Sequence, residues 1–293
     1  MKYNFLGKSD LKVSETAFGC MSLGQNQSEN DTILHKAFHA GINFFDTADL
    51  YNAGLNEETV GQSLKNIRKE VIIATKVGNQ LKSDGSGWDW NPTKSYILEA
   101  VEKSLRRLQT DYIDLYQLHG GTIDDPMDET IEAFELLKSQ GKIREYGISS
   151  IRPNVIREYI KRSGIVSVMM QYSLLDRRPE ESCLDLLQNA EISVITRGSL
   201  AQGLLVNKPP RPYLSYSETE VSQLQAELKK TGHPVSVSLS YVLRHPAVAS
   251  VVVGARTPEQ LQEILESRKT KISPEVLEKL STILEPPVYE NHR

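Results

Sequence analysis

Four polar residues stand at or just beyond the ends of short apolar runs, and their types could together transfer a proton. They are Asp46, Tyr51, Lys76 and His119. A free phenol has a pKa of about 10 and is a weak acid at neutral pH. An ammonium group beside the phenol favours the phenolate, so we expect Lys76 to lower the pKa of Tyr51.

The reaction that suits these four side chains is the reduction of a carbonyl group. Asp46 would hold Lys76 charged and oriented, and His119 would donate a hydrogen bond to the carbonyl oxygen. Tyr51 would then protonate that oxygen while hydride reaches the carbon. Because no side chain donates hydride, the pattern requires a nicotinamide cofactor. The plainer alternatives are a structural salt bridge, a hydrogen-bonded wall histidine, and a loop carboxylate with a packed tyrosine.

The elements that must position these residues form a regular alternation. Apolar runs typical of buried strands occupy 16–20, 42–45, 71–76, 112–119, 143–149, 165–172, 192–196 and 248–253. Helical patterns occupy 29–40, 57–67, 92–108, 128–140, 153–162, 180–190 and a segment starting at Pro258. This alternation of eight apolar runs with helical patterns predicts a (β/α)₈ TIM barrel, in which polar groups at strand ends meet at one mouth.

Further segments lie outside the eight units. Residues 1–14 read as an N-terminal β-hairpin, and 274–284 as an extra C-terminal helix. The stretch 207–216 is a long loop, either a lid or an inert excursion. A doubly wound sheet competes with the barrel, but Gly19–Gly24 is not a dinucleotide-binding turn. We expect residues 1–293 to form one domain.

One helix start is marked especially clearly. Asn91 suits the N-cap of the helix at 92–108, and Pro92 suits its first turn.

Composition restricts the classes of function. The 293 residues carry a net charge of −4 without a basic cluster, which argues against nucleic acid. Cys20 and Cys183 are the only cysteines, and no metal-type Cys/His spacing occurs. No apolar run reaches membrane length, and Met1–Phe5 lacks a signal core. We expect a cytoplasmic protein, monomeric or weakly homo-oligomeric, that acts on a small carbonyl compound. A metal-dependent hydrolase would need clustered ligands instead.

Motifs in the same order along the chain resemble those of the aldo-keto reductase family. They are Asp46-x4-Tyr51 with Lys76 and His119, Asp-Thr-Ala-Asp at 46–49, Leu-Gln-Thr-Asp-Tyr-Ile-Asp-Leu at 108–115, and Gly141-Lys142-Ile143-Arg144-x-x-Gly147-Ile148-Ser149. The resemblance implies NADPH-dependent reduction of aldehydes or ketones without a metal. Some members, such as potassium-channel β subunits, act mainly by binding partners. A nucleotide-binding regulatory subunit is therefore the alternative.

The segment after the last strand suits an anionic group of the cofactor. Thr257, Pro258 and Gln260 fit the N-cap, N1 and N3 positions of a helix, as in a capping box. Such a helix start binds anions, and Arg256 suits a 2′-phosphate, which favours NADPH over NADH. Gly254 opens the same turn. An ordinary capped helix with a surface arginine is the alternative.

The resemblance implies further cofactor contacts, with departures from the family. Ser149 matches the serine that binds the nicotinamide carboxamide, and Gln171 could replace the usual glutamine. Ser150 stands where the family usually has an asparagine, and Met169 where it has the glutamine. Arg197 stands at the usual aromatic platform under the nicotinamide, and Ile264 at the asparagine expected near the adenine. The guanidinium of Arg197 could still stack on a ring. The remaining expected cofactor residues are Gly198, Ser199, Leu200, Gln202 and Gly203, the last opening a segment similar to the strap over the pyrophosphate.

The segment after the third strand is expected to border the substrate. Trp88 and Trp90 could form an aromatic wall with Tyr51, or pack on the barrel rim. Gly85-Ser86-Gly87 before them suggests mobility.

Overall fold

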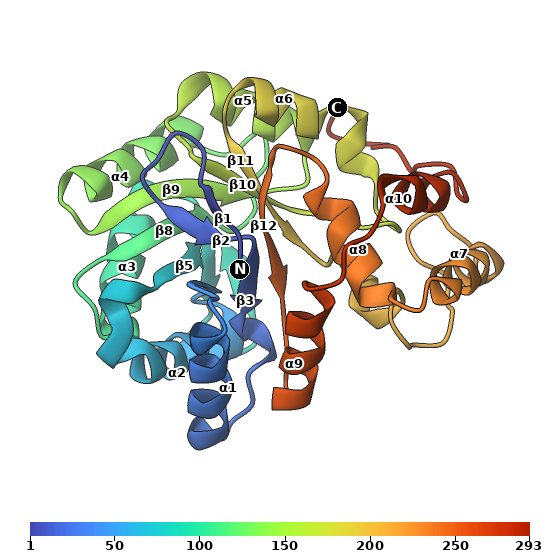
Figure 1. The fold of residues 1–293 in the computed structure, drawn as a ribbon. Coiled ribbons are helices and arrows are strands. Elements are labelled where there is room, and N and C mark those ends of the chain that lie inside the picture. The colour runs from blue at the N-terminus through green and yellow to red at the C-terminus, as the bar shows by residue number, and fades with distance from the viewer.

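A computed structural model describes residues 1–293, and its centre is a closed barrel of eight parallel strands (Figure 1). The strands are β3 (Thr16–Gly19), β4 (Phe44–Asp46), β5 (Ile72–Val77), β8 (Ile113–Leu118), β9 (Ile143–Ser149), β10 (Ser167–Gln171), β11 (Ser193–Arg197) and β12 (Val248–Val253). Neighbours in the barrel are neighbours in chain order, and β12 closes onto β3. The predicted TIM barrel is confirmed.

Strand alternation separates two apolar regions. Side chains that point inward, such as Phe44, Ala74 and Leu115, form a small core inside the barrel. The larger core lies between the strands and the surrounding helices. The β segments read as nearly continuous apolar runs because both faces of each strand are buried.

The N-terminal hairpin closes one end of the barrel, as Figure 1 shows. Strand β1 (Tyr3–Phe5) pairs antiparallel with β2 (Lys12–Ser14). Leu6, Leu11 and Val13 from this segment belong to the inner core. They cover the floor of the barrel and leave the opposite end as the mouth.

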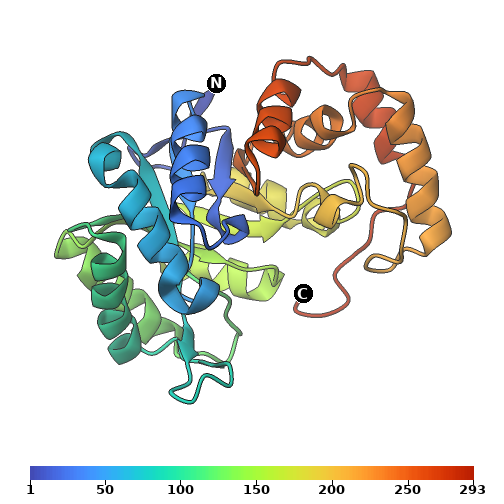
Figure 2. The ribbon, with the colours of Figure 1, turned by 90° about the horizontal axis from the view of Figure 1, so that it is seen from below.

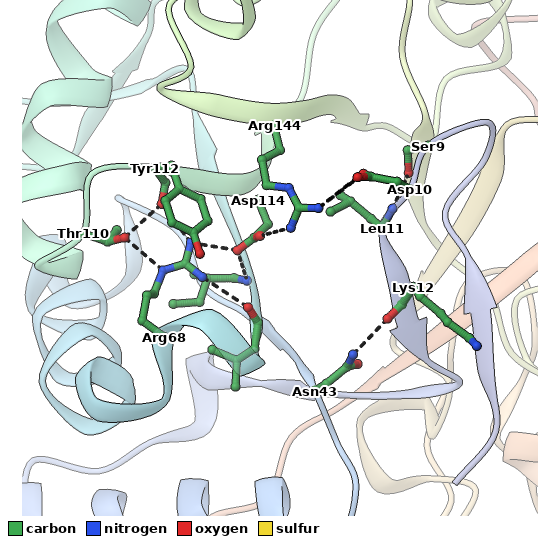
Figure 3. A network of polar contacts seen from close by, with 12 residues as sticks. Ser9, Asp10, Leu11, Lys12, Asn43, Arg68, Thr110, Tyr112, Asp114 and Arg144 are labelled. Carbon is green, nitrogen blue, oxygen red and sulfur yellow. Dashed lines mark hydrogen bonds and ion pairs between the residues drawn. The ribbon is translucent and has the colours of Figure 1, made fainter.

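A network of ion pairs joins the hairpin to the barrel beside the floor (Figure 3). The buried carboxylate of Asp114 accepts hydrogen bonds from Arg144 at 2.8 Å and from the amide of Ile73 at 3.0 Å, and it pairs with Arg68 at 2.7 Å. Arg144 also pairs with Asp10 of the hairpin at 3.3 Å. Asp114 and Arg144 belong to the motifs at 108–115 and 141–149, so these motifs contribute to stability at this end.

Ten α-helices surround the barrel. They are α1 (Gln27–His39), α2 (Leu55–Leu64), α3 (Lys94–Leu108), α4 (Met127–Ser139), α5 (Pro153–Arg162), α6 (Cys183–Asn189), α7 (Glu218–Lys230), α8 (Pro234–Leu243), α9 (Pro258–Ser267) and α10 (Pro274–Ser281). Helices α7 to α10 gather on one side of the barrel, coloured orange to red in Figures 1 and 2. None of the helices is long and apolar enough to span a membrane.

Two helices fill a stretch that the sequence pattern left unassigned. Helices α7 and α8 both lie between β11 and β12. A complete capping box starts α7, with Ser217 and Glu220 bonded reciprocally. The capping-box residues could have been recognised in the sequence. Helix α7 was not predicted because the Pro- and Tyr-rich loop before it shows no helical pattern.

The start of α3 differs from the prediction by two residues. Thr93, not Asn91, is the N-cap, and its side chain accepts from the amide of Tyr96. The side chain of Asn91 instead accepts from the amide of Thr93 at 3.2 Å. Asn91 therefore organises the turn before the helix.

The segment after β5 that contains the predicted mobile glycines is a β-hairpin. Strand β6 (Asn79–Leu81) pairs antiparallel with β7 (Trp88–Trp90). The glycines around Ser86 occupy the turn of this hairpin, where positive φ angles at Gly85 and Gly87 are required.

Candidate active site

Three adjacent strands bring a carboxylate, an amine and an imidazole to the barrel mouth. Asp46 ends β4, Lys76 lies near the end of β5, and His119 follows β8. The Lys76 ammonium lies 2.8 Å from both Asp46 carboxylate oxygens and donates to the carbonyl of Thr47 at 2.7 Å. Lys76 is 1 % exposed and Asp46 4 %, so this ion pair is shielded from solvent.

Tyr51 reaches the same site from the loop after β4. Its hydroxyl lies 3.5 Å from the Lys76 amine. The next three residues, Asn52, Ala53 and Gly54, all have positive φ angles. Left-handed backbone at two non-glycine residues is strained, and such strain is often found at functional sites. The bend turns the chain directly after Tyr51 into α2.

The imidazole of His119 faces the Tyr51 ring. The two ring centroids are 5.9 Å apart in an edge-to-face arrangement. Burial and the positive charge of Lys76 lower the pKa of His119 to about 3, so the ring is neutral at pH 7. Its Nδ1 atom is buried without a hydrogen-bond partner. A neutral imidazole can donate one hydrogen bond to a carbonyl oxygen.

We expected Lys76 to lower the pKa of Tyr51 below its usual value. This is wrong, because the pKa of Tyr51 is raised when all causes are combined. Burial raises the pKa of Tyr51 more than Lys76 lowers it, and Asp46 opposes Lys76. The phenol therefore holds its proton at neutral pH. A phenolate at this position would still be stabilised by Lys76, because its ammonium is adjacent.

Burial also acts on the ion pair. It raises the pKa of Asp46 even though Lys76 opposes this. Burial disfavours the ammonium of Lys76 as well, but Asp46 and Tyr51 together raise the pKa of Lys76 above its usual value. Lys76 thus remains charged at the mouth.

One polar residue of the mouth was missed from the sequence. Gln117 of β8 is fully buried, and in the strand register it pairs with Lys76. Neither atom of its amide has a hydrogen-bond partner, although the amide lies close enough to Asp46 to favour the ionised carboxylate. Its position two residues before His119 put it on the same face of the strand, which was the available signal.

The predicted cofactor residues of β9 and β10 divide into accessible and buried ones. Ser149 ends β9 and Ser150 follows it, and both are largely buried. Met169 is 1 % exposed and belongs to the inner core, so it lies below the mouth. Gln171 at the end of β10 is half-buried and donates to the Tyr213 hydroxyl at 3.0 Å. Tyr213, from the long loop, is a second residue the sequence did not single out.

Strand β11 ends with an exposed arginine, and a loop follows it. The Arg197 guanidinium donates to the Gln171 side-chain oxygen at 3.1 Å. Gly198 has a φ angle of +67°, and a side chain there would press on Gln171. Ser199 is buried and donates to the Thr196 hydroxyl at 3.1 Å. The remaining predicted residues of this loop are the half-buried Leu200 and Gly203 and the exposed Gln202.

The turn after β12 leads into α9 as predicted, but its cap differs. Thr257 is the N-cap and accepts from the amide of Gln260. The Gln260 side chain accepts from the amide of Arg256 at 2.8 Å, so the capping box is not reciprocal. Gly254 and Arg256 are exposed beside this helix start. Ile264 is buried in the core against the barrel.

The two tryptophans have different environments. Trp90 packs its ring over Gly78 and Gly120 and donates to Asp125 at 3.0 Å. Trp88 is 49 % exposed on the outer strand of the hairpin. Only Trp90 is therefore fixed against the rim next to His119.

A cavity of about 420 Å³ adjoins Tyr51. Its lining includes Met21, Leu23, Leu50, Tyr51, Asn52 and Asn56. It lies between the loops after β3 and β4 and has both apolar and amide groups. No group of three or more His, Cys, Asp or Glu side chains is arranged to hold a metal ion.

Comparisons with known proteins assign the family. The model of the aldo/keto reductase family matches residues 15–285. The uncharacterised oxidoreductase YqkF of Bacillus subtilis is 54 % identical over 87 % of each chain. The holo form of aldo-keto reductase AKR11C1 from Bacillus halodurans is 52 % identical, with a TM-score of 0.97 over 100 % of this chain and 99 % of that one. The chain belongs to the aldo/keto reductase family, which is a family of oxidoreductases.

A further relative bears on the cofactor. The NADH-specific methylglyoxal reductase of Escherichia coli is 35 % identical over 73 % of this chain and 72 % of its own length. At least one relative at this level of similarity is therefore specific for NADH, and family membership alone does not assign the nucleotide to this chain.

Proposed function

We propose that this protein reduces aldehydes or ketones to alcohols with NADPH. The observation that carries the proposal is the Lys76 ammonium, held between the Asp46 carboxylate at 2.8 Å and the Tyr51 hydroxyl at 3.5 Å. A buried ion pair next to a phenol is a costly arrangement for stability alone. It is well suited to a phenol that must release its proton during a reaction.

The proton step follows from the charges of the four side chains. Tyr51 and the neutral His119 both donate to the carbonyl oxygen of the substrate. As that oxygen gains negative charge, Tyr51 transfers its proton to it, and the phenolate is stabilised by Lys76. Asp46 keeps Lys76 charged and in place throughout.

The residues at the mouth fit a nicotinamide dinucleotide. When bound, this cofactor supplies the hydride, with its electron pair, to the carbonyl carbon. Ser149 and Gln171 offer polar contacts for the carboxamide, and the start of α9 with Arg256 offers an anion site. The loop from Arg197 to Gly203 would cover the pyrophosphate. Met169 and Ile264 are buried and take no part.

The preference for NADPH rests on Arg256. Its side chain is exposed beside the N-terminus of α9, where a 2′-phosphate would meet the guanidinium. The substrate is proposed to be a small carbonyl compound, taken up beside Tyr51 and Trp90. The proposed reaction involves no nucleic acid, membrane or metal ion. The protein would work in the cytoplasm, as a monomer or weak homo-oligomer.

The test is turnover of a reactive aldehyde by the Tyr51→Phe variant. Oxidation of NADPH against 4-nitrobenzaldehyde should fall at least a hundredfold, while the affinity for NADPH stays the same, because only the acid is lost. Tyr3→Phe is the matched control, since it removes a hydroxyl at the opposite end of the barrel. Retained turnover in Tyr51→Phe would remove Tyr51 from the acid role.

The competing function is a nucleotide-binding regulatory subunit with little turnover. Tight NADPH binding without reduction of any member of a broad carbonyl panel would favour it. Comparable turnover with NADH and NADPH in that panel would support the assignment as a carbonyl reductase. It would overturn the proposed preference for NADPH.

A further inference from the structure

Arg197 places a positive charge at the barrel mouth that no carboxylate balances. None of the ion pairs in the structure involves it, and its guanidinium donates only to the neutral amide of Gln171, at 3.1 Å. Gln171 is itself held by the Tyr213 hydroxyl at 3.0 Å. The guanidinium is therefore positioned without being neutralised.

The charge of Arg197 reaches the reacting groups. After burial and Lys76, Arg197 is a further cause of the low pKa of His119. It also acts on Asp46 and Tyr51, in each case opposing the effect of burial. Lys76 is balanced by Asp46, while His119 and Tyr51 are neutral. Among these five side chains, Arg197 thus supplies the one unbalanced charge.

The two redox forms of the cofactor differ in charge at the nicotinamide ring. The oxidised ring is a cation and the reduced ring is neutral, whereas the adenosine and the phosphates are the same in both. To deliver hydride, the ring must contact a carbonyl held by Tyr51 and His119, and it therefore lies within the field of Arg197. The guanidinium of Arg197 and the cationic ring would therefore repel each other. Solvent reduces this repulsion but does not remove it.

From this arrangement we infer that Arg197 makes the site bind the reduced cofactor more tightly than the oxidised one. The inference rests on the proposed function, since it requires a nicotinamide nucleotide at the mouth. It does not require the guanidinium to stack on the ring. The consequence is that the enzyme loads with the reduced form and releases the oxidised form readily after each carbonyl reduction.

The test is equilibrium binding of NADPH and NADP⁺ by titration calorimetry at low ionic strength, without substrate. The quantity compared is the ratio of the Kd of NADP⁺ to the Kd of NADPH. In Arg197→Gln this ratio should fall roughly three- to tenfold, because only the oxidised ring gains. Arg197→Lys keeps the charge and should leave the ratio within about twofold of the wild type. Added salt should lower the wild-type ratio and change that of Arg197→Gln little.

A second variant tests the charge without removing the guanidinium. Gln171→Glu places a carboxylate next to Arg197 and should lower the ratio in the same way. An unchanged ratio in Arg197→Gln overturns the inference, and if that variant does not fold, Gln171→Glu decides on the same criterion. A further outcome is that the wild type binds both nucleotides and reduces carbonyls while the Kd ratio is the same in the variants. That outcome refutes only the role of Arg197. A wild type that binds neither nucleotide refutes the proposed function itself.

Discussion

Lys76 donates to both carboxylate oxygens of Asp46 at 2.8 Å, and the two side chains come from adjacent barrel strands. Both are buried, so the pair has lost its hydration and depends on its internal contacts. The third contact of the ammonium, to the Thr47 carbonyl, and the fourth, to Tyr51, complete its surroundings. Stability and the proposed proton transfer would thus depend on the same two residues.

The first prediction concerns removal of one partner of this pair. Lys76→Met leaves the Asp46 carboxylate buried without its counter-ion and should lower the free energy of unfolding by about 3–5 kcal/mol at pH 7. The double variant Lys76→Met with Asp46→Asn should be more stable than Lys76→Met alone. Urea unfolding measures both, and turnover should be lost in each. Equal stability of the single and double variants would mean that the pair is not an ion pair.

The second prediction uses the low pKa of His119. Its pKa is about 3 in the folded state and about 6.5 in an unfolded chain, so between these values the unfolded state binds more protons. Stability should therefore fall as pH decreases from about 6.5 toward 3, and His119→Gln should reduce this slope. Thermal unfolding across this pH range provides the measurement. The exposed His39→Gln is the control, and the same change of slope in both variants would contradict the prediction.

The third prediction concerns Asp49, in the loop between Asp46 and Tyr51. Burial, with the nearby Glu57 adding to it, raises the pKa of Asp49 to about 8. One of its carboxylate oxygens has no hydrogen-bond partner. Between about pH 4, where an unfolded Asp titrates, and pH 8 the folded state binds the extra proton, so stability decreases as pH rises.

Asp49→Asn mimics the protonated carboxyl and should remove this decrease. The Tm should rise by a few degrees at pH 7.5 and change little near pH 4. The exposed Asp111→Asn serves as the control. A Tm of Asp49→Asn below that of the wild type at pH 7.5 would show that the ionised carboxylate is required.

The fourth prediction tests the anion site at the start of α9. Arg256→Ala should weaken NADPH binding roughly ten- to hundredfold and NADH binding by less than about twofold, because only NADPH carries the 2′-phosphate. Arg256→Lys should recover part of the loss, since the charge remains but the bidentate geometry does not. Fluorescence titration with both nucleotides measures the effect. Equal losses for the two nucleotides would count against a phosphate contact at Arg256.

Much of the fold was predictable because its signals are local. The strands were recognisable as apolar runs bounded by helical patterns, and their order in a parallel barrel follows from that alternation. Asp46, Lys76 and His119 could be placed at one mouth because each ends or follows a buried strand, and consecutive strands are adjacent. The family motifs at 108–115 and 141–149 were recognised correctly as a resemblance, but Asp114 and Arg144 within them lie beside the floor (Figure 3).

Other features could not be predicted from the sequence, because they depend on groups that are far apart in the chain and close together in the fold. The sequence placed an amine beside the Tyr51 phenol, but not the burial that raises the net pKa of Tyr51. The bond from Gln260 to the Arg256 amide, in place of a reciprocal capping box, depends on the exact path of the turn. The side chain of Gln171 is shared between Arg197 and Tyr213, and this requires two loops to meet.

By itself, then, the sequence determined which residues stand at strand ends and which chemistry their types permit, since both follow from periodicity along the chain. The tertiary structure decided which of them are desolvated, which charges are balanced and which are not. Those properties depend on every group within several ångströms, whatever its distance along the chain. Lys76 and Arg197 illustrate the difference: both are cations near the mouth, but only one has a carboxylate partner.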